Sequence, residues 1–528
     1  MDYIKRKDVY EAEFFCRDLD VSQDNVVRAI SVFVDYLDLK EFKFIYSEPK
    51  KFGRKSYDPK DMLKLHIYGY VRNIRSCRTL EYAAKDSTSF KWLLGELTPH
   101  YKTISNFKKD NIDSIKLVFK AFMEYCIEMG LADVELIAVD GTFFAAVNHN
   151  SKNYSAGKIK NCLKQSDKNI LRHFDEMNKF DALEDLQFQN CEEVYDEEDD
   201  DNPPDLPIAT NDRDFEKELA ELEKKKEEYN SRLEAIKESG DSQISLTDPD
   251  SRMMQKPGSQ RDVSYNIQIA VDEKNKLILL AYACSETNDK RQLHRIASAT
   301  KDFYGVDKLA VIADKGYDNG EEYKKCYESG IETYVQMQSN ERNAGTPFSS
   351  ANFHYDEEND CFICPIGRKL PYRSSKKSGS KEYGHKSVCQ GCPYLNQCAT
   401  GNKKLYRSKT LNANQYYYDR QMEINRKNQD ILSQRKCIVE HPFGTIKRNM
   451  NQGYFLTKGI KSVNGELTYT VLAYNIKRVF NILGIDRMIA SIKAYFRGDL
   501  GKRVIFVQNY VFSLKSSLFF SYLNAKTA

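Results

Sequence analysis

Three carboxylic acids lie far apart in this sequence, in surroundings that suit divalent-metal chemistry. Asp140 closes the apolar stretch of "ELIAVDGTFFA", Asp314 closes that of "KLAVIADKG", and a glycine follows each closely. We interpret both stretches as buried strands that end on an accessible carboxylate. If the strands are neighbours in one sheet, the two charges repel each other. Mg²⁺ takes oxygen ligands and relieves that repulsion, so Asp140 and Asp314 are a candidate metal pair.

A third acidic group is expected from a helix near the end of the chain. "SQRKCIVEHPFGTIKRNM" offers Glu440, and Lys447 follows seven residues later, two helical turns on and therefore on the same face. Lys447 is suited to contact phosphate beside the metals. Taken singly, a strand-end aspartate is usually a turn or cap residue, and Glu440 with Lys447 is an ordinary exposed pair. Only their combination points to catalysis.

Five cysteines form a second candidate site. Cys361-x2-Cys364 is followed by Cys389-x2-Cys392 and then by Cys398, a spacing that predicts a structural Zn²⁺ in a zinc ribbon. His385 and Cys398 compete as alternative ligands. The alternative is a loop of reduced, metal-free thiols. The segment between the two pairs is basic with interleaved tyrosines, which suits contact with a DNA backbone.

Bulk properties limit the classes of protein. At 528 residues, with 41% hydrophobic and 30% charged residues, we expect several domains of a globular protein. No apolar run is long enough for a transmembrane helix, and the N-terminus lacks the apolar core of a signal peptide. A reducing cytosol is therefore the expected compartment.

Charge is distributed unevenly along the chain. Residues 51–110 hold 13 Lys/Arg against 6 Asp/Glu, residues 361–410 hold 11 against 1, and residues 192–205 hold 9 acidic residues and no basic one. Two basic segments separated by an acidic one favour a polyanionic partner, with solvated charged surfaces as the alternative. The acidic run is expected to be a mobile loop.

In the first part of the chain, the expected elements are helices. Residues 1–130 predict several short helices closed by tight turns, typical of a helix-turn-helix-like module. The helix from Tyr101 would present its polar side to phosphates and base edges. Those residues are Lys102, Ser105, Asn106 and Lys109. A plain helical bundle with a basic surface is the alternative.

The rest of the chain alternates strands with insertions. A strand at 134–146 precedes a polar segment, in which Phe215, Leu219, Leu222, Tyr229, Leu233 and Ile236 keep heptad spacing and Lys226 interrupts it. That pattern predicts a helical hairpin or coiled-coil arm. A strand hairpin around 272–276, a helix, the strand before Asp314 and long helices near 412–450 and 464–484 follow. This order predicts an α/β domain interrupted twice.

Several short stretches, taken in their order along the chain, resemble those of a bacterial insertion-sequence transposase of the DDE class. They are "AVDGTFFAA", "YNIQIAVD", "SETNDKRQL", "VIADKGYDN", "VEHPFGTIKR" and "LAYNIKRVF" after the helical "YDPKDMLKLHIYGYVRNIRSCRTLE". The resemblance implies an α/β, RNase H-like catalytic core and the catalytic set Asp140, Asp314, Glu440 and Lys447. It also implies two Mg²⁺ ions (Mn²⁺ as a substitute) and DNA contacts by Lys436 and Arg448. One branch of the family has Tyr-x2-Arg-x3-Glu-x6-Lys around its glutamate, where this chain has Ser433 and Lys436.

This resemblance implies the following organisation. An all-α DNA-binding domain occupies 1–130, and the core occupies 131–150, 250–345 and 412–485. The insertions are a charged helical segment, 151–249, and a zinc-ribbon-like segment, 346–411, and a tail spans 486–528. We expect end cleavage and strand transfer on double-stranded DNA, homodimers in the DNA complex, and a cytoplasmic, nucleoid-associated location. The alternatives are a DDE nuclease without strand transfer and an inactive, transposase-derived DNA-binding regulator.

Overall fold

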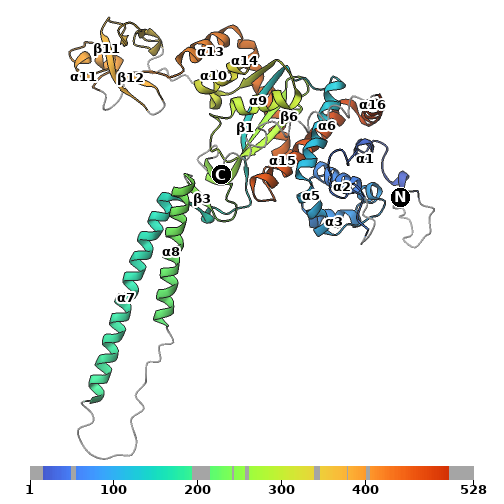
Figure 1. Cartoon of the computed structure of the whole chain (residues 1–528), viewed down its shortest axis with the longest axis horizontal. Coiled ribbons are helices and arrows are strands. Elements are labelled where there is room, and N and C mark those ends of the chain that lie inside the picture. Colours follow the sequence, from blue (N-terminus) through green and yellow to red (C-terminus); the bar gives the residue numbers. More distant parts are fainter. Residues whose placement is uncertain are drawn as a thin grey trace, which may run out of the picture. The chain divides into compact units, whose positions relative to one another are not determined.

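The computed structural model describes residues 16–48, 55–192, 214–240, 243–255, 261–337, 345–376, 379–399 and 405–498. The chain is a mixed α/β protein, as predicted (Figure 1). It divides into two compact units, residues 145–264 and all residues before and after them. Within the described ranges, no helix is long and apolar enough to cross a membrane. Most of the predicted acidic loop, residues 193–205, lies outside the described residues.

Short helices make up the first 130 residues, as predicted for the part that is described. After a turn of 3₁₀ helix, η1 (Arg17–Asp20), come α1 (Val27–Tyr36), α2 (Pro59–Val71), α3 (Cys77–Asp86), α4 (Thr88–Leu94), α5 (Tyr101–Asp110) and α6 (Ile112–Glu128). Helix α2 begins at Pro59, whose fixed φ suits the first helical position, and the Asp58 carboxylate caps it by accepting from Lys60 N at 2.7 Å. Nearly every residue of α2 is buried, so this helix is the centre of the bundle.

The central sheet holds the predicted strands. They are β1 (Leu136–Ala145), β5 (Arg261–Asp272), β6 (Ile278–Cys284) and β7 (Leu309–Ala313), and a further strand, β8 (Ile331–Val335), was not predicted. The order is β5-β1-β7-β8, β6 pairs antiparallel with β5, and β1, β7 and β8 run parallel. The strand hairpin predicted around Asp272 is confirmed as β5–β6. The strand predicted over 134–146 is confirmed as β1, but it runs through Asp140 to Ala145, so the expectation that it ends on Asp140 was wrong.

Further helices lie between and after these strands in the sequence. They are α9 (Leu293–Tyr304), η3 (Lys315–Tyr317), α10 (Gly320–Glu328), α13 (Gln415–Lys427), α14 (Gln429–Gly444), the π-helix η5 (Thr445–Asn449), α15 (Ile460–Leu483) and α16 (Ile485–Gly498). The long helix predicted over 412–450 is broken at Asn428, because that residue leaves helical geometry (φ −128°, ψ 44°). Helix α14 packs on β7 and β8, whereas α15 packs on β6, α2 and α6.

The second unit is built around a helical hairpin. Its elements are η2 (Asn150–Lys152), β2 (Asn153–Ser155), α7 (Ala156–Glu192), α8 (Phe215–Ser239), β3 (Gln243–Ser245) and β4 (Arg252–Gln255). Helices α7 and α8 lie side by side (Figure 1). Lys226, which interrupts the apolar heptad of α8, pairs with Asp167 of α7 at 2.7 Å. The seam therefore contains an ion pair between the two helices.

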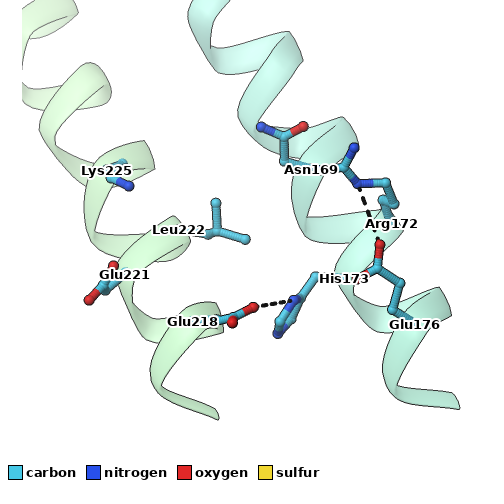
Figure 2. A pocket seen from close by; sticks show the side chains of 8 residues that line it. All are labelled: Asn169, Arg172, His173, Glu176, Glu218, Glu221, Leu222 and Lys225. Atoms are coloured by element: carbon cyan, nitrogen blue, oxygen red, sulfur yellow. Dashed lines mark ion pairs between the residues drawn. The ribbon is translucent and has the colours of Figure 1, made fainter. Parts of the chain in front are cut away.

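A polar hollow of about 240 Å³ lies between α7 and α8 (Figure 2). His173 is buried there, with Nδ1 3.6 Å from Glu218 Oε2 and Nε2 2.8 Å from Phe215 O. Arg172 pairs with Glu176 on the same helix at 3.8 Å. The two contacts of His173 join the helices through polar groups.

The cysteine-bearing segment has a small sheet and a core of its own. Strands β9 (His354–Asp356), β10 (Cys361–Ile363), β11 (Lys369–Ser375), β12 (Lys381–Tyr383) and β13 (Lys409–Leu411) form an antiparallel sheet, accompanied by η4 (Ser350–Asn352), α11 (Lys386–Cys389) and α12 (Leu395–Cys398). Its core comprises Phe353, Phe362, Leu370, Tyr383 and Cys389.

Candidate active site

Two aspartates meet on neighbouring parallel strands. The register of β1 and β7 pairs Leu136 with Ala310 and Ala138 with Ile312. Continued by two residues, the same register sets Asp140 beside Asp314, the first residue after β7. Residues that share a register position in parallel strands point to the same face of the sheet. The structure therefore brings the two predicted carboxylates together.

A third carboxylate, Asp289, joins them from the loop between β6 and α9. Its Oδ1 accepts hydrogen bonds from Asn266 Nδ2 at 2.8 Å and from Gln268 Nε2 at 2.6 Å, both on β5. Gln268 in turn accepts from the Tyr317 hydroxyl at 2.5 Å. Asp289 lies in "SETNDKRQL", where the sequence alone gave it no role. Its signal was an acidic residue in a polar loop directly after a buried strand.

Gly141 is required by this closeness. A Cβ atom at Gly141 would lie 2.5 Å from Asp289 Oδ1 and 2.6 Å from Gln268 Nε2, well inside van der Waals contact. Any side chain at this position would displace Asp289 or the amide that holds it. The glycine after Asp140 therefore leaves room for the third carboxylate beside β1.

Burial and neighbouring charges raise the pKa values of Asp140 and Asp289. Burial raises the pKa of Asp140 to about 7, Arg435 opposes the rise, and the charges of Asp314 and Asp289 add to it. Arg435 Nη1 lies 3.5 Å from Asp140 Oδ2. Burial also raises the pKa of Asp289, its bonds to Asn266 and Gln268 oppose the rise, and Asp314 adds to it. Such a site favours a positive charge, whether a proton, an arginine or a cation.

Glu440 and Lys447, the two residues predicted on the long helix, are both exposed but have different surroundings. Glu440 is exposed on α14, and no contact joins it to the aspartates among the described residues. Lys447, on the π-helix η5, donates to the Thr142 hydroxyl, two residues beyond Asp140 on β1, and lies 5.7 Å from the Phe144 ring. Pro442 lies inside α14, just before η5. Arg435, which also lies on α14, was not predicted as a partner of Asp140. Lys447 thus connects the helix to the strand that carries Asp140.

No group of three or more His, Cys, Asp or Glu side chains in the described ranges, neither these carboxylates nor the cysteines of residues 361–398, stands in metal-holding geometry. The donors at the strand ends are all oxygen atoms of carboxylates, the type that hard divalent cations prefer. Their mutual repulsion is the physical property that a bound cation relieves.

Models of two known protein families match this chain. Residues 15–110 match a transposase domain family (DUF772), and residues 363–480 match a transposase DDE domain family. The second matched range includes Glu440 and Lys447. These two matches support a DDE-class insertion-sequence transposase. No curated protein matches it.

One solved structure is similar to this transposase over much of its length. It is the cryo-EM structure of a piggyBac transposase synaptic complex with hairpin DNA, at 9% identity, covering 92% of this chain and 84% of that one. The TM-score of 0.29 is too low for the likeness to support any argument about fold.

The polar face predicted on the helix from Tyr101 is at the surface of the transposase. Lys102, Ser105, Asn106 and Lys109 of α5 are all exposed, whereas Ile104, Phe107 and Lys108 are buried. Lys436 and Arg448, the other predicted DNA contacts, are exposed as well. These side chains are therefore accessible to a polyanion.

The predicted zinc ligands fall into two groups. Cys364, Cys389, Cys392 and Cys398 line one cavity of about 20 Å³. Cys361, on β10, is buried away from that cavity and lines a hollow with Asp360, Lys369 and Tyr372. His385 is the capping residue of α11, and its Nδ1 lies 2.7 Å from the Ser387 hydroxyl. All of these cysteines are free thiols.

Proposed function

We propose that this transposase binds the ends of its mobile element, cleaves them and joins the freed 3′-hydroxyl ends to target DNA. The observation that carries the proposal is the in-register placement of Asp140 beside Asp314, with Asp289 against both. A protein that only bound DNA would gain nothing from three repelling, partly buried carboxylates. The arrangement of β5, β6 and the parallel strands β1, β7 and β8 supports an RNase H-like core.

The carboxylates suit two Mg²⁺ ions, with Mn²⁺ as a substitute, because hard cations take oxygen ligands. We propose Asp140, Asp314 and Glu440 as the protein ligands. When bound, the ions supply an activated oxygen nucleophile and stabilisation of the leaving oxygen in an in-line displacement at phosphorus. Water is the nucleophile in end cleavage, and the freed 3′-hydroxyl is the nucleophile in joining.

The chain's own residues position the carboxylates and the DNA. Asn266 and Gln268 orient Asp289, and Arg435 balances the charge of Asp140. Lys447 lies beside Thr142 on the strand of Asp140, where its ammonium would hold a phosphate of the scissile strand. Each of these roles requires a charged or polar atom held near the strand ends.

DNA binding is assigned to the N-terminal helical domain. The exposed polar face of α5 would contact phosphates and base edges, and Lys436 and Arg448 would contact the backbone near the carboxylates. Cleaving two element ends together requires two active sites, so a homodimer in the DNA complex is proposed, with the α7–α8 hairpin available for pairing.

End cleavage and joining with Mg²⁺ test the proposal on DNA that carries the terminal repeats beside the coding region. We expect Asp140→Asn and Asp314→Asn to lose about 10²-fold or more in both steps and to keep end binding, since even outer partners of metal ligands contribute 10–100-fold. The matched control is Asp307→Asn, because Asp307 is an exposed aspartate that precedes β7, whereas Asp314 follows it. Full cleavage by Asp140→Asn would refute the assignment.

The same assay separates the alternatives. Cleavage without joining, even of ends that are already nicked, identifies a DDE nuclease. Specific end binding with no cleavage by the parent protein identifies an inactive regulator. Glu440→Gln and Asp289→Asn, compared side by side, show which of the two acts as the third metal ligand.

A further inference from the structure

From the cysteine-bearing segment, we infer a structural zinc site made by Cys364, Cys389, Cys392 and Cys398, with Cys361 excluded. The inference goes beyond the proposed DNA chemistry and does not depend on it. It also differs from what the cysteine spacing indicates, because two Cys-x2-Cys pairs would normally supply all four ligands.

Strand geometry separates Cys361 from Cys364. Successive side chains of a strand point to opposite faces, so residues three apart cannot share a face. Cys361 is the first residue of β10, and Cys364 directly follows the strand. Phe362, two residues before Cys364, belongs to the same small core as Cys364, whereas Cys361 lines the hollow on the other side. The first Cys-x2-Cys pair therefore contributes one thiol only.

The other four thiols surround one small cavity. Its volume of about 20 Å³ suits a single water-sized occupant. Cys364 and Cys398 also pack against the core cluster to which Cys389 belongs. The four thiols do not stand in metal-holding geometry in this structure, and zinc binding requires their sulfur atoms to close to about 2.3 Å from one ion.

The turn after Cys364 has features of a metal-binding loop. Arg368 N donates to Cys364 Sγ at 3.3 Å, and Gly367 N donates to Cys364 O at 2.8 Å. Gly367 has φ +83°, a left-handed conformation that glycine adopts without strain. The amide of Arg368 therefore holds the Cys364 sulfur beside the cavity that the other three thiols line.

Two arginines supply compensating charge. Arg368 Nη1 donates to Val388 O at 2.6 Å and to Gln390 O at 3.2 Å, which ties the first cysteine loop to the second. Arg407 Nη1 donates to Cys398 O at 3.2 Å, and its buried Nε has no partner among the described residues. A zinc ion with four thiolates carries a net charge of about −2. Both guanidiniums therefore stand where that charge would develop.

The test is the zinc content of the purified full-length protein, measured by mass spectrometry of the metal after exposure to a mild chelator. We expect about one zinc per chain in the parent and in Cys361→Ser, and loss of most of it in Cys398→Ser. Cys361→Ser is the matched control, because it removes one buried thiol from the same segment. A parent without zinc refutes the site, and loss in Cys361→Ser with retention in Cys398→Ser refutes the ligand set.

Co²⁺ in place of zinc gives a readout that needs no destabilising variant. Thiolate ligands produce intense charge-transfer absorption, and four of them are expected in the parent and in His385→Ala alike. A spectrum that changes in His385→Ala would show histidine ligation and overturn the set of four cysteines. DNA activity plays no part in either measurement, so failure of the zinc site and failure of the proposed transposition are distinguishable.

Discussion

Glu466 on α15 is a buried carboxylate whose removal should destabilise the packing of the N-terminal helices on the core. Its side chain is fully buried, with Arg75 Nη1 at 3.4 Å and Lys108 Nζ at 3.8 Å. It also accepts from Leu456 N at 3.1 Å and from Thr457 N and Oγ1 at 3.1 and 2.7 Å. One side chain therefore balances two buried cations and ties the segment before α15 to α5 and the turn before α3.

Glu466→Gln keeps the shape and removes the charge. Breaking a buried ion pair by removing one partner costs about 3–5 kcal/mol. With a urea slope near 3 kcal/mol per molar, that is a midpoint shift of about 1–2 M. The single tryptophan, Trp92, lies on α4 and reports unfolding of the N-terminal helices by its fluorescence. The control is Glu423→Gln, whose exposed partner Lys427 lies at 2.7 Å. We expect it to shift the midpoint little, since surface pairs contribute about 0.2–1 kcal/mol.

The penalty should also depend on pH. Burial lowers the pKa of Lys108, and Glu466 is the largest influence that opposes the decrease. Without that charge, the folded state releases the Lys108 proton at a lower pH than the unfolded chain, so stability rises with pH across that window. The loss caused by Glu466→Gln should therefore be smaller at about pH 9.5 than at pH 7. If Glu466→Gln shifts the midpoint no more than Glu423→Gln does, the buried-charge reasoning is wrong.

Three further outcomes are expected from single substitutions. In chelator at about pH 8, Asp140→Asn should be more stable than the parent by on the order of 2–4 kcal/mol, because burial raises the pKa of Asp140 from 3.8 to about 7 and disfavours its charged form. The gain should fade as the pH drops through 7 towards 4, and a thermal-shift difference that stays constant over that range would contradict it. Gly141→Ala should leave the fold intact but reduce Mg²⁺-dependent end cleavage by about 10²-fold through displacement of Asp289, and unchanged cleavage would contradict the crowding. Lys226→Leu should increase hydrogen-exchange protection of α7 and α8, whereas Lys226→Ala should change it by less than about 1 kcal/mol, because the ion pair with Asp167 is half exposed.

The sequence by itself determined the elements whose signals are local. Apolar runs and their periodicity predicted β1, β7 and the β5–β6 hairpin, and helical spacing predicted the exposed face of α5 and the apolar seam of α8. Asp140 and Asp314 were found in the same way, because a carboxylate beside a glycine at the end of an apolar run is visible without the fold.

Only the tertiary structure decided what depends on long-range neighbours. Asp289 joins the site because two amides of β5 hold it, and Arg435 reaches Asp140 from a helix nearly 300 residues away. The break at Asn428 likewise follows from packing rather than from composition. Among the cysteines, spacing paired Cys361 with Cys364, yet the alternation of side chains along β10 places them on opposite faces. Counting residues between thiols does not reveal whether they lie in a turn or a strand, and that difference decides which sulfur atoms can meet.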